Sequence, residues 1–352
     1  MRSVSVPASR EYDIVIGSGA LSELGDRLRS LTKAKTAVLV AGERVFPLYG
    51  QQVLRLLEQA GFHTASFVHP SGEGAKSLRV YGELLNFLSE RQISRDDVLL
   101  SLGGGVTGDL AGFAAATYRR GMDFVQIPSS LLSMVDASVG GKTGVNLPAG
   151  KNLVGCFYQP KLVLCDCALL STLPDEEYRS GCAEIIKTAM LHSPEFLASV
   201  RETPVSEQYE RVIATCVSFK RDLVVEDEFD RGRRQLLNFG HSIGHAIEVC
   251  SDYSLRHGEA VAAGMAMITR AAAAKEICGR GCFAALLDTL RAYGLSASCD
   301  ISREKLREAM TNDKKRSGDA LRLVVPEDLG RFRIESVPLP ELDDWLRLGG
   351  AL

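Results

Sequence analysis

The sequence predicts an α/β protein in two domains: a Rossmann-like domain with a parallel sheet at residues 1–172, and a helical domain at residues 173–352. The chain has 352 residues, which is long enough for two domains that each bury a core. Up to about residue 172, short β-branched runs alternate with helical patterns, as is typical of a parallel sheet. Beyond that point, nearly every apolar pattern has the period of a helix.

The individual elements follow from apolar periodicity, taken in chain order. In the first domain we expect strands at residues 12–16, 36–40, 97–102, 124–127 and 162–164, with helices at 21–31, 53–60, 78–88 and 110–118. Pro174 and the acidic residues after it predict the start of the first helix of the second domain. In that domain we expect helices at 175–191, 195–202, 206–223, 233–250, 258–277, 282–293, 302–311 and 341–348, and a hairpin of 321–325 with 331–334.

Composition excludes several classes of protein. Apolar residues make up 45% and charged residues 24%, which are the values of an ordinary globular protein. The net charge of −3 provides no general basic field, so we expect neither nucleic acid nor a membrane surface as a partner. We find no secretory signal and no apolar run of about 18 residues. Nine cysteines without a C-x-x-C pair favour reduced thiols and a cytoplasmic protein.

A glycine-rich loop follows the expected strand at 97–102. Gly103, Gly104 and Gly105 lie between this strand and a helix, so backbone N–H groups there could approach a pyrophosphate. Ser129 and Ser130 follow the next strand, where their hydroxyls either face a cofactor or cap a helix. The loop therefore predicts a nucleotide-binding site.

Two other glycine motifs have weaker interpretations. Gly17-Ser18-Gly19 is part of a G-x-G-x-x-G pattern without its third glycine, and we expect a simple turn there. The tripeptide Gly141-Lys142-Thr143 is not a Walker A loop, because the required earlier glycine position is occupied by Asp136. This spacing argues against an ATPase.

Three of the six histidines, His241, His245 and His257, lie close together in the sequence of the helical domain. His241 and His245 are four residues apart, on one face of an expected helix. Glu184 is flanked by apolar residues and is the candidate carboxylate, and Lys187 lies one turn later on the same face. A single histidine of this kind is more often a hydrogen-bonded core residue. The cluster, however, is typical of a catalytic divalent metal site.

Taken together, these motifs closely resemble the 3-dehydroquinate synthase family over nearly the whole chain. The segments that carry the resemblance are residues 103–109, 118–121, 128–146, 150–160, 183–187, 237–248 and 257–260. The resemblance implies an NAD-binding domain, a helical domain that binds metal and substrate, one Zn²⁺ or Co²⁺ ion, and a homodimer. It also implies conversion of 3-deoxy-D-arabino-heptulosonate 7-phosphate to 3-dehydroquinate and phosphate, in the shikimate pathway. The steps would be transient oxidation by NAD, phosphate elimination, re-reduction and an intramolecular aldol reaction.

The resemblance also assigns residues by motif. Glu184, His241 and His257 would be the metal ligands, and Arg120 would reach the phosphate site of the neighbouring subunit. Substrate contacts would be made by Asp136, Lys142, Asn152, Lys187, Lys220, Arg234, Asn238, His245 and Lys314, with Lys315 as an alternative to Lys314. NAD contacts would be made by Glu73, Lys76, Gly104, Gly105, Val106, Asp109, Ser129, Ser130, Lys142, Lys151, Thr172 and Leu173.

One departure and several alternatives remain. The family usually carries Asp and Asn where this chain has Gly42 and Arg44, which puts the contacts to the adenosine end of NAD in question. The nearest alternative is another sugar-phosphate cyclase, although Arg234, Lys220 and Asn238 favour a substrate that bears a carboxylate. A metal-dependent glycerol or alcohol dehydrogenase has no use for so many phosphate-binding cations. A catalytically inactive interaction protein would have lost a ligand or a cation.

Overall fold

The computed structural model describes residues 1–312, 316–317 and 319–352. The chain forms two compact units: unit 1 comprises Met1–Leu173 and Ile213–Phe229, and unit 2 comprises Pro174–Val212 and Asp230–Leu352. This division differs from the expected one at residue 173, because most of helix α7 (Tyr209–Glu226) and the residues after it belong to unit 1. The ring of Phe229, for example, packs edge-on against that of Phe157 with the centroids 5.4 Å apart.

Unit 1 is built on a seven-stranded sheet with the order β1-β2-β9-β6-β5-β3-β4. All neighbouring pairs are parallel except β1 with β2. The strands are β1 (Arg2–Pro7), β2 (Glu11–Gly17), β3 (Thr36–Gly42), β4 (His63–His69), β5 (Val98–Gly103), β6 (Asp123–Pro128) and β9 (Leu162–Asp166). Every residue of β5 and β9 is buried, as expected for strands covered on both faces. The Rossmann-like parallel sheet predicted from the sequence is confirmed.

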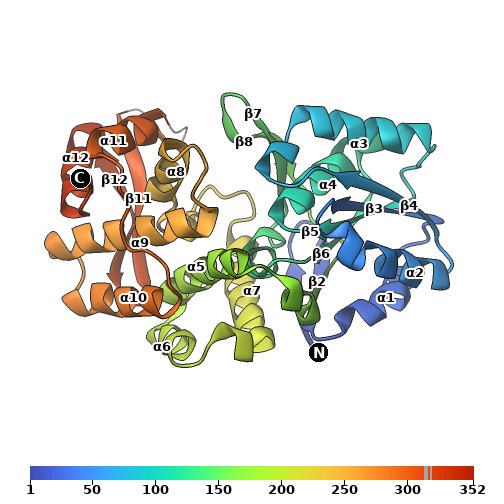
Figure 1. Cartoon of the computed structure of the whole chain (residues 1–352), viewed down its shortest axis with the longest axis horizontal. Helices are drawn as coiled ribbons and strands as arrows, with labels where there is room; N and C mark the ends of the chain where they lie inside the picture. The colour runs from blue at the N-terminus through green and yellow to red at the C-terminus, as the bar shows by residue number, and fades with distance from the viewer. Residues whose placement is uncertain (313–315, 318) are drawn as a thin grey trace. The chain divides into compact units, whose positions relative to one another are not determined.

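Helices cover both faces of this sheet. Figure 1 shows α3 (Leu78–Glu90) and α4 (Gly105–Thr117) on one side, and α1 (Leu24–Leu31) and α2 (Gln51–Gln59) on the other. On the first side, Val80, Leu84 and Leu88 of α3 pack in one apolar cluster with residues of α4 and with β3 and β5. Their spacing of four residues places these side chains on one face of the helix, which is why the sequence pattern located α3 correctly.

The sequence pattern missed four strands of unit 1. Strand β1 pairs antiparallel with β2, and β4 lies at the other edge of the sheet, where most of its residues are only half-buried. Strands β7 (Lys142–Leu147) and β8 (Gly150–Phe157) form a separate antiparallel hairpin, and β7 includes Lys142 and Thr143 of the Gly141-Lys142-Thr143 tripeptide. Edge strands and small hairpins bury few side chains, so their apolar periodicity is weak.

Unit 2 is arranged around α9 (His257–Ala274), most of whose residues are buried. Helices α5 (Asp175–His192), α8 (His241–Cys250), α10 (Arg280–Ala292) and α12 (Leu342–Leu348) contact α9. The remaining helices are α6 (Pro194–Glu202), the first residues of α7, and α11 (Arg303–Asn312). Strands β10 (Arg316–Ser317), β11 (Ala320–Asp328) and β12 (Arg331–Pro338) form an antiparallel sheet, which confirms the expected hairpin.

The single helix expected at residues 233–250 of unit 2 is wrong, because the chain forms two separate elements there. A 3₁₀ turn occupies Arg233–Asn238, and α8 begins only after Gly240, which has a φ of 78°. A left-handed residue cannot continue an α-helix, so the chain changes direction immediately before His241.

Among the residues that the structure describes, none of the helices combines the length and the hydropathy needed to cross a membrane.

Candidate metal centre and nucleotide site

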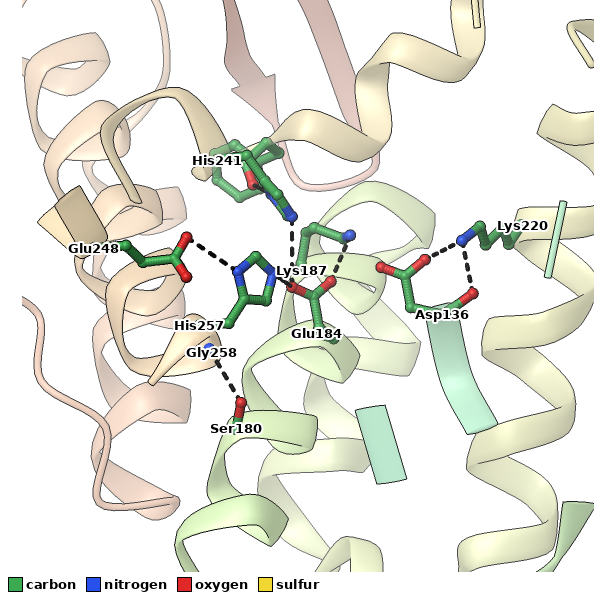
Figure 2. Close-up of polar contacts among 10 residues, drawn as sticks. Asp136, Ser180, Glu184, Lys187, Lys220, His241, Glu248, His257 and Gly258 are labelled. Carbon is green, nitrogen blue, oxygen red and sulfur yellow. Dashed lines mark hydrogen bonds and ion pairs between the residues drawn. The ribbon is translucent and has the colours of Figure 1, made fainter. Parts of the chain in front are cut away.

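Three helices of unit 2 bring the expected metal ligands together. Glu184 lies in the middle of α5, while His241 and His257 are the first residues of α8 and α9. The start of α9 lies directly on α5, because the Gly258 N–H donates to Ser180 Oγ at 3.1 Å (Figure 2). A Cβ atom at Gly258 would collide with the backbone of Ser180, so only glycine permits this approach. The close packing fixes the position of His257 relative to Glu184.

The ligand atoms of these three residues converge. Glu184 Oε1 lies 3.3 Å from His257 Nε2 and 3.6 Å from His241 Nε2, and the three ligand atoms lie within 4.8 Å of one another (Figure 2). His241 Nδ1 lies 3.1 Å from the Phe239 carbonyl, which can only accept, so Nδ1 carries the proton and Nε2 offers its lone pair. A carboxylate and two imidazoles form a donor set that suits Zn²⁺ or Co²⁺. The residues therefore fit a catalytic divalent ion.

Cationic groups surround the Glu184 carboxylate. Lys187 Nζ lies 2.5 Å from Glu184 Oε2, and both side chains are only 1% exposed. Burial by itself lowers the pKa of His257, but hydrogen bonds to Glu184 and Glu248 outweigh it and raise this pKa to about 9. A metal ion would therefore have to displace a proton from His257, as is usual for an imidazole ligand.

The other expected residues of unit 2 lie near this cluster or on the segment before it. The His245 ring is 5.4 Å from the His241 ring and 6.0 Å from the His257 ring, centroid to centroid. Arg234 is 1% exposed and lies in the 3₁₀ turn before α8, and Asn238 Nδ2 donates to the Gln235 carbonyl at 3.1 Å. Lys314 lies outside the described residues, as does its alternative, Lys315.

Glu248 belongs to this cluster, and the sequence analysis missed it. Its Oε2 lies 3.3 Å from His257 Nδ1, and its ligand atoms also converge with those of His245 and His257. The signal that could have identified it is the one that identified Glu184, namely a glutamate among apolar neighbours on a helix. Glu248 follows His245 by three residues, which places it on the same face of α8.

In unit 1, the glycine-rich loop has the shape expected of a phosphate cradle. Gly104 caps α4 without a side-chain hydrogen bond, and a Cβ added there would lie 3.4 Å from Ser130 Oγ. The Ser129 N–H donates to the Gly103 carbonyl at 2.9 Å, which holds the two loops side by side. The first turn of α4 includes Gly105 and Val106, and N–H groups at this end favour an anion. The expected residues of the loop are thus brought together, and they fit a dinucleotide pyrophosphate.

Behind this loop, polar side chains form one network. Lys76, which is 5% exposed, donates from Nζ to Asp109 Oδ2 and Asn152 Oδ1. Burial raises the pKa of Asp109, and the charge of Lys76 partly opposes this rise. Glu73 Oε1 accepts from Asn146 Nδ2 at 2.7 Å. Asn152, assigned to the substrate by resemblance, therefore contacts Lys76, a residue assigned to NAD, and shares it with Asp109.

The remaining expected residues of unit 1 are distributed more widely. Lys220 Nζ donates to the carboxylate of Asp136 and, at 2.7 Å, to its carbonyl oxygen (Figure 2). Thr172 Oγ1 lies 2.6 Å from the Tyr49 hydroxyl. Four residues complete the set: the exposed Lys142 on β7, the half-buried Lys151 on β8, Leu173 at the end of unit 1 and the exposed Arg120.

Gly17-Ser18-Gly19 leads into a turn whose backbone N–H groups are hydrogen-bonded within the protein. The N–H groups of Gly19 and Leu21 donate to the two carboxylate oxygens of Asp166 at 2.8 and 2.9 Å. A carboxylate of the chain itself thus occupies the place that an anionic ligand would need, so the expectation of a plain turn is confirmed.

The comparison with known proteins adds an independent line of support. The model of the 3-dehydroquinate synthase N-terminal domain matches residues 66–180, and that of the C-terminal domain matches residues 181–316. The chain belongs to the 3-dehydroquinate synthase family. A 3-dehydroquinate synthase of Enterococcus faecalis is 41% identical, with 99% of each chain covered. One from Streptococcus pneumoniae is 43% identical, with 95% of this chain and 96% of the relative covered. The family resemblance stated from the motifs is confirmed.

Solved structures share the fold of this 3-dehydroquinate synthase family member. A 2-deoxy-scyllo-inosose synthase, complexed with carbaglucose-6-phosphate, NAD⁺ and Co²⁺, has a TM-score of 0.90 at 22% identity, with 98% and 99% of the chains covered. A 2-epi-5-epi-valiolone synthase from Streptomyces hygroscopicus, with NAD⁺ and Zn²⁺ bound, has a TM-score of 0.87 at 26% identity and 99% coverage of both chains. A probable glycerol dehydrogenase from Sinorhizobium meliloti is more distant, with a TM-score of 0.64 at 15% identity, covering 96% of this chain and 95% of its own.

Proposed function

We propose that this protein is a 3-dehydroquinate synthase, which converts 3-deoxy-D-arabino-heptulosonate 7-phosphate to 3-dehydroquinate and phosphate. The observation that carries the proposal is the convergence of Glu184, His241 and His257, in a chain 41% identical to a 3-dehydroquinate synthase over 99% of its length. The nucleotide loop around Gly104 supports NAD as the second cofactor. The protein is thus an NAD- and metal-dependent lyase that eliminates phosphate.

When bound, NAD would accept and return a hydride, and a divalent cation would lower the pKa of a substrate hydroxyl. Glu184, His241 and His257 would hold the cation, and Gly104, Gly105 and the serines opposite would hold the pyrophosphate. Lys187 would then stand beside the cation and offer an N–H donor to the substrate, since its Nζ already faces Glu184. The task of the protein is to position a single substrate through several steps.

The charged groups of the substrate would be recognised by cations and amides. We assign the substrate carboxylate to Arg234 and Lys220, because a guanidinium binds a carboxylate in a bidentate manner. The phosphate is assigned to Lys142, Asn152, His245 and Lys314. Asp136 orients Lys220 through their ion pair, and Asn238 completes the set.

The decisive experiment measures phosphate and NADH in one reaction. The purified protein should release phosphate from the proposed substrate without net accumulation of NADH, because the hydride is returned. EDTA should abolish this activity, and Zn²⁺ or Co²⁺ should restore it. A glycerol or alcohol dehydrogenase would instead accumulate NADH and release no phosphate. A different sugar-phosphate cyclase would be inactive with this substrate and active with another sugar phosphate.

We further propose a homodimer in which Arg120 completes the phosphate site of the partner. The conformation of the segment supports this, since Arg119 and Arg120 both have positive φ, 52° and 65°, just before Gly121. Such strain costs about 1–3 kcal/mol per residue, and it commonly accompanies a functional role. We also propose a cytoplasmic location, which the nine free cysteines support.

A further inference from the structure

The imidazole of His257 lies between two carboxylates. Its Nε2 is 3.3 Å from Glu184 Oε1, and its Nδ1 is 3.3 Å from Glu248 Oε2 (Figure 2). Glu184 is 1% exposed and Glu248 is 3% exposed. A buried carboxylate loses its hydration and needs partners in the protein, and the His257 imidazole is one such partner of Glu248. Each ring nitrogen thus has its own carboxylate.

Two interpretations of Glu248 compete. Its oxygen, with nitrogens of His245 and His257, forms a second set of atoms that lie within 4.8 Å of one another and could hold an ion. Alternatively, Glu248 accepts the Nδ1–H of His257, which leaves the Nε2 lone pair free for an ion beside Glu184 and His241. The two interpretations exclude each other, because His257 Nδ1 cannot both donate a proton to Glu248 and bind a metal ion beside it.

We propose that Glu248 is a positioning residue, not a metal ligand, and that it holds the Nδ1–H tautomer and the ring orientation of His257. The inference rests on the metal site of the proposed function. A carboxylate on the outer nitrogen of an imidazole ligand fixes the tautomer and makes the ligating nitrogen more basic. His241 is held in the same way, since the Phe239 carbonyl occupies its Nδ1. Both imidazoles therefore present Nε2 to Glu184.

The local structure explains why Glu248 can hold this position. It lies in the last turn of α8, where its backbone carbonyl accepts from Ser251 Oγ at 3.0 Å and from the Tyr253 N–H at 2.8 Å. These bonds stabilise the end of the helix independently of the side chain. The contacts between α8 and α9 then fix the distance between the Glu248 carboxylate and His257.

The test is a zinc titration of the full chain, in competition with a chromophoric chelator and without substrate. Glu248→Ala should weaken zinc binding by about 10- to 100-fold, and Glu248→Asp should recover part of the loss. Ser251→Ala is the matched control. It removes a hydrogen bond to the same residue without touching the ring, so it should lower thermal stability and leave the zinc affinity within about twofold.

Two further readouts separate positioning from a structural role and from a second ion. The visible absorption of the Co²⁺ protein should change in Glu248→Ala and remain unchanged in Ser251→Ala, because only the first alters the imidazole ligand. Wild-type protein should bind one equivalent of zinc. An unchanged zinc affinity and Co²⁺ spectrum in Glu248→Ala would overturn the proposal. So would a second equivalent in the wild type that Glu248→Ala removes.

If Glu248→Ala does not fold, Glu248→Gln decides. Glutamine keeps the size of the side chain but removes its negative charge. The zinc affinity of Glu248→Gln should therefore be lower than that of wild type. Wild-type affinity in a folded Glu248→Gln protein would count against the role of the charge. Because no substrate is used, a protein that binds zinc as expected but releases no phosphate would refute only the proposed function.

Discussion

Replacing Lys76 by methionine should destabilise unit 1 through the carboxylate that it leaves behind. Lys76 is 5% exposed, and its Nζ donates to Asp109 and Asn152. Methionine fills nearly the same volume, so the main loss is the positive charge. Breaking a buried ion pair from one side costs roughly 3–5 kcal/mol, and the 22% exposure of the Asp109 side chain argues for the lower end, about 3 kcal/mol.

The pH dependence of this loss has a definite sign. Burial raises the pKa of Asp109, and removing Lys76 removes the main influence that lowers it. A pKa that is higher in the folded than in the unfolded state means that the folded state binds the proton more tightly. Stability is then lost as the pH rises through the folded-state pKa. The deficit of Lys76→Met should therefore be largest at neutral and alkaline pH, and should shrink as the pH falls and Asp109 is protonated.

The assay is urea unfolding of protein freed from nucleotide, at several pH values. The control is Lys76→Met combined with Asp109→Asn, which removes both charges and should lie within about 1 kcal/mol of wild type at neutral pH. A double variant as unstable as Lys76→Met would refute the argument from an unpaired buried charge. So would a deficit that does not change with pH.

Two further predictions concern the proposed substrate contacts. Arg234→Ala should raise KM and lower kcat/KM by more than about tenfold, as expected from loss of a charge-assisted bidentate contact, and wild-type kinetics would refute the role. Arg120→Ala mixed with Glu184→Gln should regain activity after subunit exchange, because one site of each heterodimer would be intact. Two inactive variants that stay inactive when mixed would exclude a shared site.

The sequence predicted the parts of the fold that bury long apolar stretches. The central strand β5 is a continuous apolar run, α3 carries a clear helical period and α9 is a long, mostly apolar stretch, and all three appear where expected. The edge strand β4 and the hairpin of β7 and β8 were missed, since they bury few side chains. The break at Gly240 was missed because periodicity alone does not reveal a positive φ.

The candidate site shows the same limit at the level of single contacts. A spacing of four residues placed His241 and His245 on one helix face, but the sequence could not determine which nitrogen of His241 or of His257 faces Glu184. That choice depends on Phe239 and Glu248, which the fold brings to the rings. The sequence also could not assign α7 to a domain. Its helical pattern is like that of the other helices of the second half, although most of it belongs to unit 1.

The adenosine end of the nucleotide site leads to the last prediction. Strand β3 ends at Gly42, and the carboxylate of Glu43 accepts from the Ser71 N–H at 3.0 Å, so it is already engaged. An acidic group after such a strand commonly binds the ribose 2′-OH of NAD, whereas an arginine accommodates a 2′-phosphate, and Arg44 is exposed here.

We therefore expect the protein to prefer NAD over NADP by less than about 100-fold, or about 2.7 kcal/mol, in titrations of nucleotide-free protein. Gly42→Asp should increase the preference for NAD, because it adds an acidic group after β3 that can bind the ribose 2′-OH. The position has room for a side chain, since a Cβ there would make only ordinary contacts, 3.5 Å from His69 Cε1 and 4.0 Å from Thr107 Oγ1. Arg44→Ala should weaken NADP binding and leave NAD binding unchanged. A larger preference in the wild type, with NADP affinity insensitive to Arg44→Ala, would mean that other loops determine the specificity.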